Sequence, residues 1–362
     1  MERLMDLSPV ERPANAQPWK KIKVSLKLVI LLCSIFPIAL SAGYLLLTGA
    51  DLMATIVTVF LPLQLLGGAI AGVFGFGRRG ILDGILLVVT FFFSAFVLIL
   101  LLSVLWSVIE GGAKAISPHF FYQNNVYVDP TAPLEIGGVG HAILGSLLIV
   151  GLSTVITVPL GIATAVYITE TRGKSRGLIR SLLQAMSGLP SVVAGLFVYA
   201  MLIASGFTQY VGIAGSIALV PLMLPTVARV AEEALRLVPK ELRNGALALG
   251  APAWRAFLQV TLPAAKSGIV TAVLLGVARV IGETAPLILT TFAANNTNLN
   301  LFEGGMATLP TYLYNYVSMG FDTSIQRAWG AALVILILVG VLFSAARIST
   351  RSTPGPKPKK RK

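Results

Sequence analysis

Two residues of opposite charge stand in an otherwise apolar stretch of this sequence. Arg279 and Glu283 lie four residues apart within a run that extends from Ile269 to Phe292. On a helix, this spacing places both side chains on one face, where they can form an ion pair. At about 1.5 Å of rise per residue, Arg279 lies roughly 15 Å into the run, close to the middle of a bilayer whose hydrocarbon core is about 30 Å thick.

A guanidinium at this depth is suited to binding an anion. A central arginine costs about 2.5 to 3.5 kcal/mol on insertion scales, so such a residue usually faces a polar pathway and has a partner. Its planar fork of donors matches the geometry of an oxyanion, and Glu283 can pair with it when no substrate is bound. We therefore predict that Arg279, Glu283 and the adjacent Thr284 line a substrate pathway. A buried ion pair that only fixes helix packing is the alternative interpretation.

The same stretch contains residues that can bend a helix. Pro286 has no backbone N–H and leaves a carbonyl one turn earlier without its donor, so we expect a kink just beyond the charged pair. Gly282 lies between the two charged residues. We interpret Gly282 and Pro286 as a gate or kink in the pathway.

Other chemistry is poorly represented in the sequence. His119 and His141 have no second pair of ligands at metal spacing, and Cys33 is the only cysteine. The nearest approach to a phosphate-binding loop is Gly173-Lys-Ser175, but Ile168 occupies the position of the first glycine that this motif needs. We expect no catalytic residue, no metal ion and no cofactor on this chain.

The elements that must position these residues are membrane helices. The 362 residues are 56% hydrophobic and 12% charged, with a mean hydropathy of +0.83, which is far from the composition of soluble proteins. Runs of about 18 or more apolar residues can cross the bilayer as helices. We find about eight and predict an all-α polytopic membrane protein. The runs are Leu26–Leu47, Leu52–Phe76, Ile81–Val108, Ala142–Ile168, Leu182–Ala204, Val211–Ala228, Ile269–Phe292 and Trp329–Ala346.

The basic residues predict an orientation. Lys and Arg accumulate on the cytoplasmic side of membrane proteins, and with both chain ends inside, only Lys114 and Arg327 of the 28 basic residues lie outside. We therefore predict a multi-pass protein of the bacterial plasma (inner) membrane with both termini cytoplasmic. The net charge of +13 follows from inner loops beside an anionic leaflet, so the expected partner is membrane lipid and not nucleic acid.

A predicted cytoplasmic loop over residues 229–267 carries a specific resemblance. Asn244-Gly-Ala-Leu-Ala-Leu-Gly250, followed after nine residues by Val260-Thr-Leu-Pro263, resembles the EAA loop of ABC importer permeases, with Asn244 and Gly245 in place of the usual Glu and Ala. The final glycine of the first stretch permits a sharp turn between two short helices. The resemblance implies that the loop couples to ATPase subunits. The residues that it assigns to coupling are Asn244, Gly245, Ala246, Leu249, Gly250 and Ala251.

A second resemblance concerns the charged stretch itself. Gly282-Glu-Thr-Ala-Pro-Leu287 is similar to a signature of the A-type permease of phosphate importers, the PstA family. It implies a transmembrane permease subunit, not an enzyme, of an ATP-driven inorganic phosphate importer. The implied partners are a second homologous permease, a dimer of ATP-binding subunits that holds ATP and magnesium, and an extracytoplasmic phosphate-binding protein. A permease for another oxyanion, sulfate or molybdate, is the first alternative, and an ion-coupled secondary transporter is a more distant one.

The resemblance also divides the chain. It implies a six-helix type I ABC importer permease core over residues 77–348, preceded by an extra transmembrane hairpin over residues 25–76. Residues 1–24 are predicted to form a cytoplasmic tail. Residues 349–362 are predicted to form a second, basic tail that ends in Lys359-Lys-Arg-Lys362.

Overall fold

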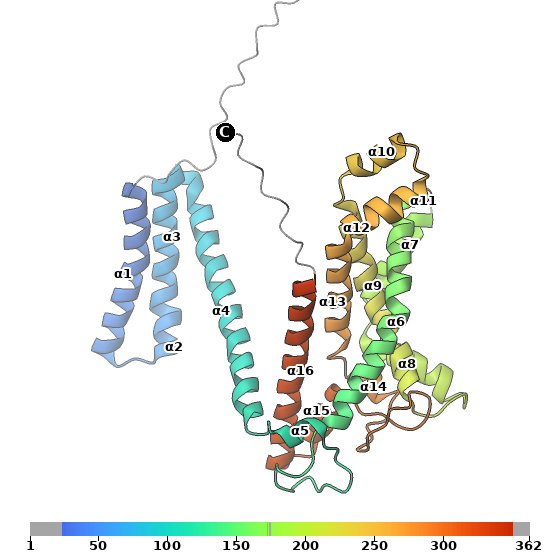
Figure 1. The fold of residues 1–362 in the computed structure, drawn as a ribbon. Coiled ribbons are helices and arrows are strands. Elements are labelled where there is room, and N and C mark those ends of the chain that lie inside the picture. The colour runs from blue at the N-terminus through green and yellow to red at the C-terminus, as the bar shows by residue number, and fades with distance from the viewer. Residues whose placement is uncertain (1–23, 172, 174, 350–362) are drawn as a thin grey trace, which may run out of the picture. The chain divides into compact units, whose positions relative to one another are not determined.

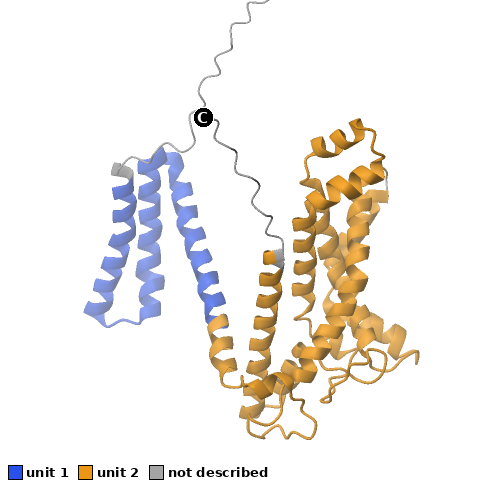
Figure 2. Cartoon of the chain, in the orientation of Figure 1, with its two compact units in different colours: residues 1–104 blue, residues 105–362 orange. Residues whose placement is uncertain are grey.

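The structure, a computed structural model, describes residues 24–171, 173 and 175–349. Every regular element within these residues is a helix, which confirms the predicted all-α class. The two predicted tails, residues 1–24 and 349–362, fall almost wholly outside the described residues. Figure 2 shows the chain divided into two compact units, residues 1–104 and residues 105–362.

The first unit contains three long helices. They are α1 (Val24–Thr48), α3 (Leu61–Phe76) and the first part of α4 (Gly80–Ala113), and the short α2 (Leu52–Thr55) and a π-helical turn (Ile56–Phe60) lead into α3 (Figure 1). Asp51 caps α2, because its Oδ2 accepts a hydrogen bond of 3.0 Å from the Ala54 amide. A 3-10 turn over Gly77–Arg79 joins α3 to α4.

Glycines let these helices approach closely. A Cβ atom on Gly72 would lie 2.0 Å from the Gly80 carbonyl oxygen, and one on Gly67 would lie 2.5 Å from the Cys33 carbonyl oxygen. Close backbone packing at small residues is typical of helix pairs in membranes. Because the first part of α4 packs on α3 in this way, it belongs to the first compact unit, which ends at residue 104.

The second unit contains the predicted site. Figure 1 shows α10 and α11 at one end of this unit and α5 and α15 at the other. Its helices after α4 are α5 (Pro118–Tyr122), α6 (Gly140–Glu170), α7 (Ser175–Ser187), α8 (Ser191–Val198, continued by a π-helical turn to Ile203), α9 (Gly212–Arg236), α10 (Lys240–Ala248), α11 (Ala253–Ala256, followed by a π-helical turn over Phe257–Thr261), α12 (Leu262–Ala264), α13 (Lys266–Val280), α14 (Ala285–Ile288), α15 (Leu309–Ser318) and α16 (Asp322–Ser349).

Helix α9 lies at the centre of the second unit, packed between α6 and α13. Val227 shows how close the packing is. A Cβ atom on Gly161 of α6 would lie 2.7 Å from Val227 Cγ1, and one on Gly276 of α13 would lie 2.6 Å from Val227 Cγ2. Leu219 and Met223 of the same helix are completely buried, so α9 forms the core against which the other helices are positioned.

Within the described residues, five helical runs are long and apolar enough to cross a membrane, namely Lys27–Thr48, Leu52–Ala113, Gly140–Glu170, Gly212–Arg236 and Asp322–Ala345. Two bent helix pairs, α7 with α8 and α11–α12 with α13, pass the same test. The run Leu52–Ala113 has 62 residues, far more than one crossing needs, and it folds back where α3 meets α4. The predicted count of about eight is met if both limbs of this run and both bent pairs each cross the bilayer.

The predicted span Leu182–Ala204 is not a continuous helix. α7 ends at Ser187, α8 begins at Ser191, and the two meet at an angle of 98°. Pro190 accounts for the break, because its missing N–H and fixed φ suit a residue that precedes a helix and not one inside it. The predicted span over these residues is therefore interrupted at Pro190.

Candidate functional site

The predicted pathway residues lie where helices of the second unit break. The predicted span Ile269–Phe292 is interrupted, because α13 ends at Val280 and residues 281–284 form a turn before α14. α14 packs against α8, just beyond the other break, and a Cβ atom on Gly195 of α8 would lie 2.6 Å from Pro286 Cα. Two interrupted helices therefore meet at this place.

Arg279 lies in the last turn of α13, and its side chain is exposed. Its Nη1 donates a hydrogen bond of 3.2 Å to Thr226 Oγ1 on α9. Among the described residues, this is the one polar partner that Arg279 has. The other guanidinium donors are available to a ligand or to another subunit.

The predicted ion pair between Arg279 and Glu283 is absent. The three ion pairs among the described residues join other side chains. The break is the reason, because the helix does not continue to Glu283 and a spacing of four residues no longer places the two side chains on one face. Glu283 lies half-buried in the turn, where its amide donates to the Val280 carbonyl at 3.1 Å.

Pro286 explains the position of the break. It occupies one of the first two positions of α14, where its missing N–H has no intrahelical partner to lose. In a continuous helix the ring of Pro286 would clash with the Gly282 carbonyl, and that carbonyl would lack a donor. The break therefore falls between the charged residues, whereas the sequence suggested a kink beyond them. Gly282 is exposed, Thr284 is half-buried and Pro286 is buried.

The EAA-like loop forms the predicted pair of short helices, α10 and α11. Gly250 between them has a φ of +85°, a left-handed conformation that glycine adopts without strain. α10 buries none of its residues. Leu242 and Leu249 are 50% and 91% exposed, so the loop presents apolar side chains of the kind that a partner protein covers.

The other predicted coupling residues lie on the same short segment. Asn244 and Gly245 are exposed on α10, and Ala246 and Ala251 are half-buried. The Ala251 amide donates to the Ala246 carbonyl at 3.1 Å and closes the turn after α10. The six residues thus form one compact knob, although their role in coupling stays a prediction.

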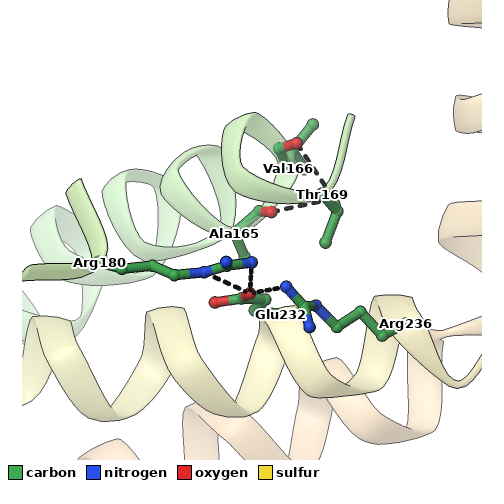
Figure 3. A network of polar contacts seen from close by, with 6 residues as sticks. All are labelled: Ala165, Val166, Thr169, Arg180, Glu232 and Arg236. Carbon is green, nitrogen blue, oxygen red and sulfur yellow. Dashed lines mark hydrogen bonds and ion pairs between the residues drawn. The ribbon is translucent and has the colours of Figure 1, made fainter. Parts of the chain in front are cut away.

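Ion pairs hold helices together at the α10 end of the second unit. Figure 3 shows Arg180 of α7 and Arg236 of α9 converging on one oxygen of Glu232, at 2.6 and 2.7 Å. Arg243 of α10 pairs with Glu170, the last residue of α6, at 2.5 Å. Local spacing could have indicated the pair of Glu232 with Arg236, which are four residues apart on one helix. It could not indicate the pair of Arg180 with Glu232, which lie 52 positions apart.

A completely buried arginine lies near the other end of the unit. Arg327 of α16 donates to the carbonyl oxygens of Pro130 (3.3 Å), Ala132 (2.9 Å), Pro133 (2.8 Å) and Ile136 (3.0 Å). These bonds clamp the loop between α5 and α6 onto α16. The sequence identified Arg327 only as a basic residue outside the membrane.

Asn125 anchors the same loop. Its Nδ2 donates to the hydroxyl groups of Tyr312 (2.9 Å) and Tyr316, and its Oδ1 accepts from the Gly138 amide at 2.8 Å. Burial raises the pKa of both tyrosine hydroxyls, so they stay neutral. His141 packs edge to face against Tyr312. In the part of the chain that the structure describes, no three His, Cys, Asp or Glu side chains are grouped so that they could hold a metal ion.

The sequence and the fold are similar to those of known membrane transport proteins. Residues 157–353 match the family of binding-protein-dependent transport system inner membrane components. The phosphate transport system permease protein PstA 1 of Mycobacterium tuberculosis (strain CDC 1551 / Oshkosh) is 40% identical over 261 residues, which are 71% of this chain and 85% of that protein. The PstA protein of Pasteurella multocida (strain Pm70) is 34% identical over 275 residues, 75% of this chain and 96% of that protein. The inward-facing MetNI methionine ABC transporter is similar over 59% of this chain and 93% of its own, with a TM-score of 0.47 and 19% identity.

The matched family region contains both helix breaks and the EAA-like loop, and it covers more than half of the chain. The apolar helices and this match together identify a multi-pass inner membrane protein that associates with other ABC transporter subunits. The chain therefore belongs to the family of binding-protein-dependent transport system inner membrane components, in which its relatives at 34% and 40% identity are PstA permeases.

Proposed function

We propose that this chain is a transmembrane permease subunit of an ATP-driven importer of inorganic phosphate. Its relatives at 34% and 40% identity are named phosphate transport system permease proteins. The turn that separates α13 from α14 belongs to Gly282-Glu-Thr-Ala-Pro-Leu287, the stretch that resembles the phosphate permease signature. Both observations favour phosphate over sulfate or molybdate.

The exposed guanidinium of Arg279 is the observation that carries this proposal. An arginine on a membrane helix is costly in lipid unless it faces water or a polar partner. Thr226 occupies one of its donors, and a guanidinium has five in a planar fork. Enough donors remain to bind phosphate in a bidentate manner. We place Arg279 on one wall of the pathway and a second, related permease on the other.

The turn between α13 and α14 is the proposed gate. Glu283 and Thr284 lie in this turn, and neither is held inside a helix. Gly282 is exposed and has open space around the position of a Cβ atom, and its backbone can adopt conformations that other residues avoid. A shift of the turn would bring Glu283 toward Arg279 when phosphate leaves.

The EAA-like loop is the proposed connection to ATP hydrolysis. The exposed Leu242 and Leu249 would dock on a dimer of ATP-binding subunits, which holds the ATP and magnesium that this chain does not bind. The distribution of Lys and Arg favours a cytoplasmic location for this loop and for both termini. An extracytoplasmic binding protein would deliver phosphate at the opposite end. ATP binding would draw the coupling loops of the two permeases together and open the proposed pathway at Arg279 outward.

Uptake of labelled phosphate into proteoliposomes that hold the whole complex tests the proposal. Arg279→Ala is expected to lower ATP-dependent uptake more than about tenfold, because losing a charge-assisted contact to a desolvated anion costs on the order of 2 kcal/mol or more. Arg78→Ala is the matched control, since it removes an exposed arginine from the first unit. Phosphate should compete for uptake, whereas sulfate and molybdate should not.

Each other outcome has a defined meaning. Normal uptake by the Arg279→Ala complex would show that the charge is structural and would refute the site. Uptake of labelled sulfate or molybdate, without uptake of labelled phosphate, would keep the family and change the substrate. Uptake that proceeds without ATP would favour an ion-coupled secondary transporter.

A further inference from the structure

An ion pair links the short helix α10 to a membrane helix. α10 has nine residues and buries none of them, so few contacts hold it in place. Its Arg243 Nη1 lies 2.5 Å from Oε2 of Glu170 at the end of α6. The two side chains are 32% and 22% exposed, and this partial burial shields the pair from solvent.

The two charges are placed where each stabilises the other. Glu170 lies at the carboxyl end of α6, where the helix dipole disfavours a negative charge. The positive charge of Arg243 neutralises the Glu170 carboxylate and interacts favourably with the negative end of the α6 dipole. A helix as short as α10 is marginal in water by itself, so its position depends on the elements to which it is anchored.

Helix α6 connects this pair to the candidate site. It packs along α9, and Ser216 Oγ of α9 donates to the Ile149 carbonyl of α6 at 3.1 Å. α9 carries Thr226, which accepts the hydrogen bond from Arg279. A displacement of α10 can therefore reach Arg279 by routes on both sides of the helix pair α9–α13. Along the chain, α10 continues through α11 and α12 into α13, which carries Arg279 itself. Two further routes lead to α9 and α6. One runs along the chain into α9, and the other runs through the ion pair into α6.

We propose that Glu170 and Arg243 are positioning residues that make α6 follow α10 when the ATP-binding subunits move it. The inference rests on the proposed function, because it takes α10 as the element on which those subunits act. Without the pair, α10 would keep its chain connections to α9 and α11 and its contacts with the turn Phe257–Thr261, but nothing would tie it directly to the end of α6, and part of its displacement would not reach α6. ATP would then be hydrolysed with less phosphate carried.

The test measures phosphate transported per ATP hydrolysed by the whole complex in proteoliposomes. Arg243→Gln and Glu170→Gln should each lower this ratio by roughly two- to fivefold, the range expected for a partly exposed ion pair, while ATP hydrolysis continues. The exchanged pair, Glu170→Arg combined with Arg243→Glu, should restore most of the ratio. Arg236→Gln is the matched control, since its own ion pair of 2.7 Å lies within α9 and the pair of Glu232 with Arg180 of α7 remains.

The outcomes separate this inference from the proposed function. A wild-type complex that carries no phosphate refutes the function itself. If the wild type transports and both single variants keep its ratio, the inference alone is wrong. The inference is also wrong if the complex no longer assembles with either single variant and the exchanged pair restores neither assembly nor transport, because the ion pair then serves only packing. A lowered ratio that the exchanged pair restores, with Arg236→Gln unchanged, supports it.

Discussion

The buried Arg327 allows a stability prediction that can be worked from the structure. Arg327→Leu removes the guanidinium that holds residues 130–136 against α16 and leaves the carbonyl oxygens of four residues without this donor. Three of the contacts come from Nη2, which has only two hydrogens, so they are not three full bonds. Pro130 keeps a second bond of 2.6 Å from the Thr323 hydroxyl.

The expected magnitude follows from these contacts. A hydrogen bond that involves a charged group contributes about 1.5 to 3 kcal/mol, so two full bonds give roughly 3 to 6 kcal/mol. These values are already net of hydration, and we take their lower end, about 3 kcal/mol, because three acceptors share the two hydrogens of Nη2. At about 2 to 4 °C per kcal/mol for a large domain, the Tm of the solubilised complex should fall by roughly 5 °C or more.

Hydrogen exchange of the whole complex provides the local assay. Arg327→Leu should increase amide exchange over residues 130–136 and lower the Tm, because the clamp is lost in the native state. Lys114→Gln removes an exposed basic residue between α4 and α5 and should change neither quantity. If Arg327→Leu leaves both the exchange and the Tm at their wild-type values, the four contacts do not stabilise the loop and the reasoning is refuted.

Two further predictions concern glycines. Gly72→Ala should lower the Tm, because its methyl group would lie 2.0 Å from the Gly80 carbonyl oxygen. Gly43→Ala on α1 is the control, since a methyl group there has open space and should leave the Tm unchanged. Equal Tm values for the two variants would contradict the close packing of α3 and α4. Gly250→Ala should weaken binding of the ATP-binding subunits by about 1 kcal/mol or more, since a Cβ atom disfavours its φ of +85°. A binding titration measures this effect against Gly340→Ala, which has open space in α16, and equal affinities would refute it.

The fold class and the Gly250 turn could be predicted from the sequence because both depend on nearby residues. In lipid, every backbone N–H and C=O group must be paired within the protein, so long apolar runs are forced into helices. The turn follows from a glycine at a fixed place between two helical patterns. Neither prediction requires knowledge of which distant segments meet.

The partners of charged residues could not be predicted in the same way. Local spacing favoured Glu283 as the partner of Arg279, but the acceptor that the structure shows, Thr226, lies 53 positions away. The error began with the helix itself, since Pro286 can either kink a helix or begin a new one. Here it begins α14, and the close approach of Gly195 to Pro286 is a tertiary contact that no local pattern records.

The broken helix at Arg279 also bears on why such a chain needs a second subunit. Non-helical backbone at membrane depth is tolerated only where protein or a water-filled cavity covers it. Arg279 and Gly282 are exposed on the second unit, so in lipid alone this face would carry the cost of a charge, about 2.5 to 3.5 kcal/mol, and that of unpaired backbone groups. A second protein surface opposite the break removes these costs. It also leaves between the two surfaces the polar space that an anion requires.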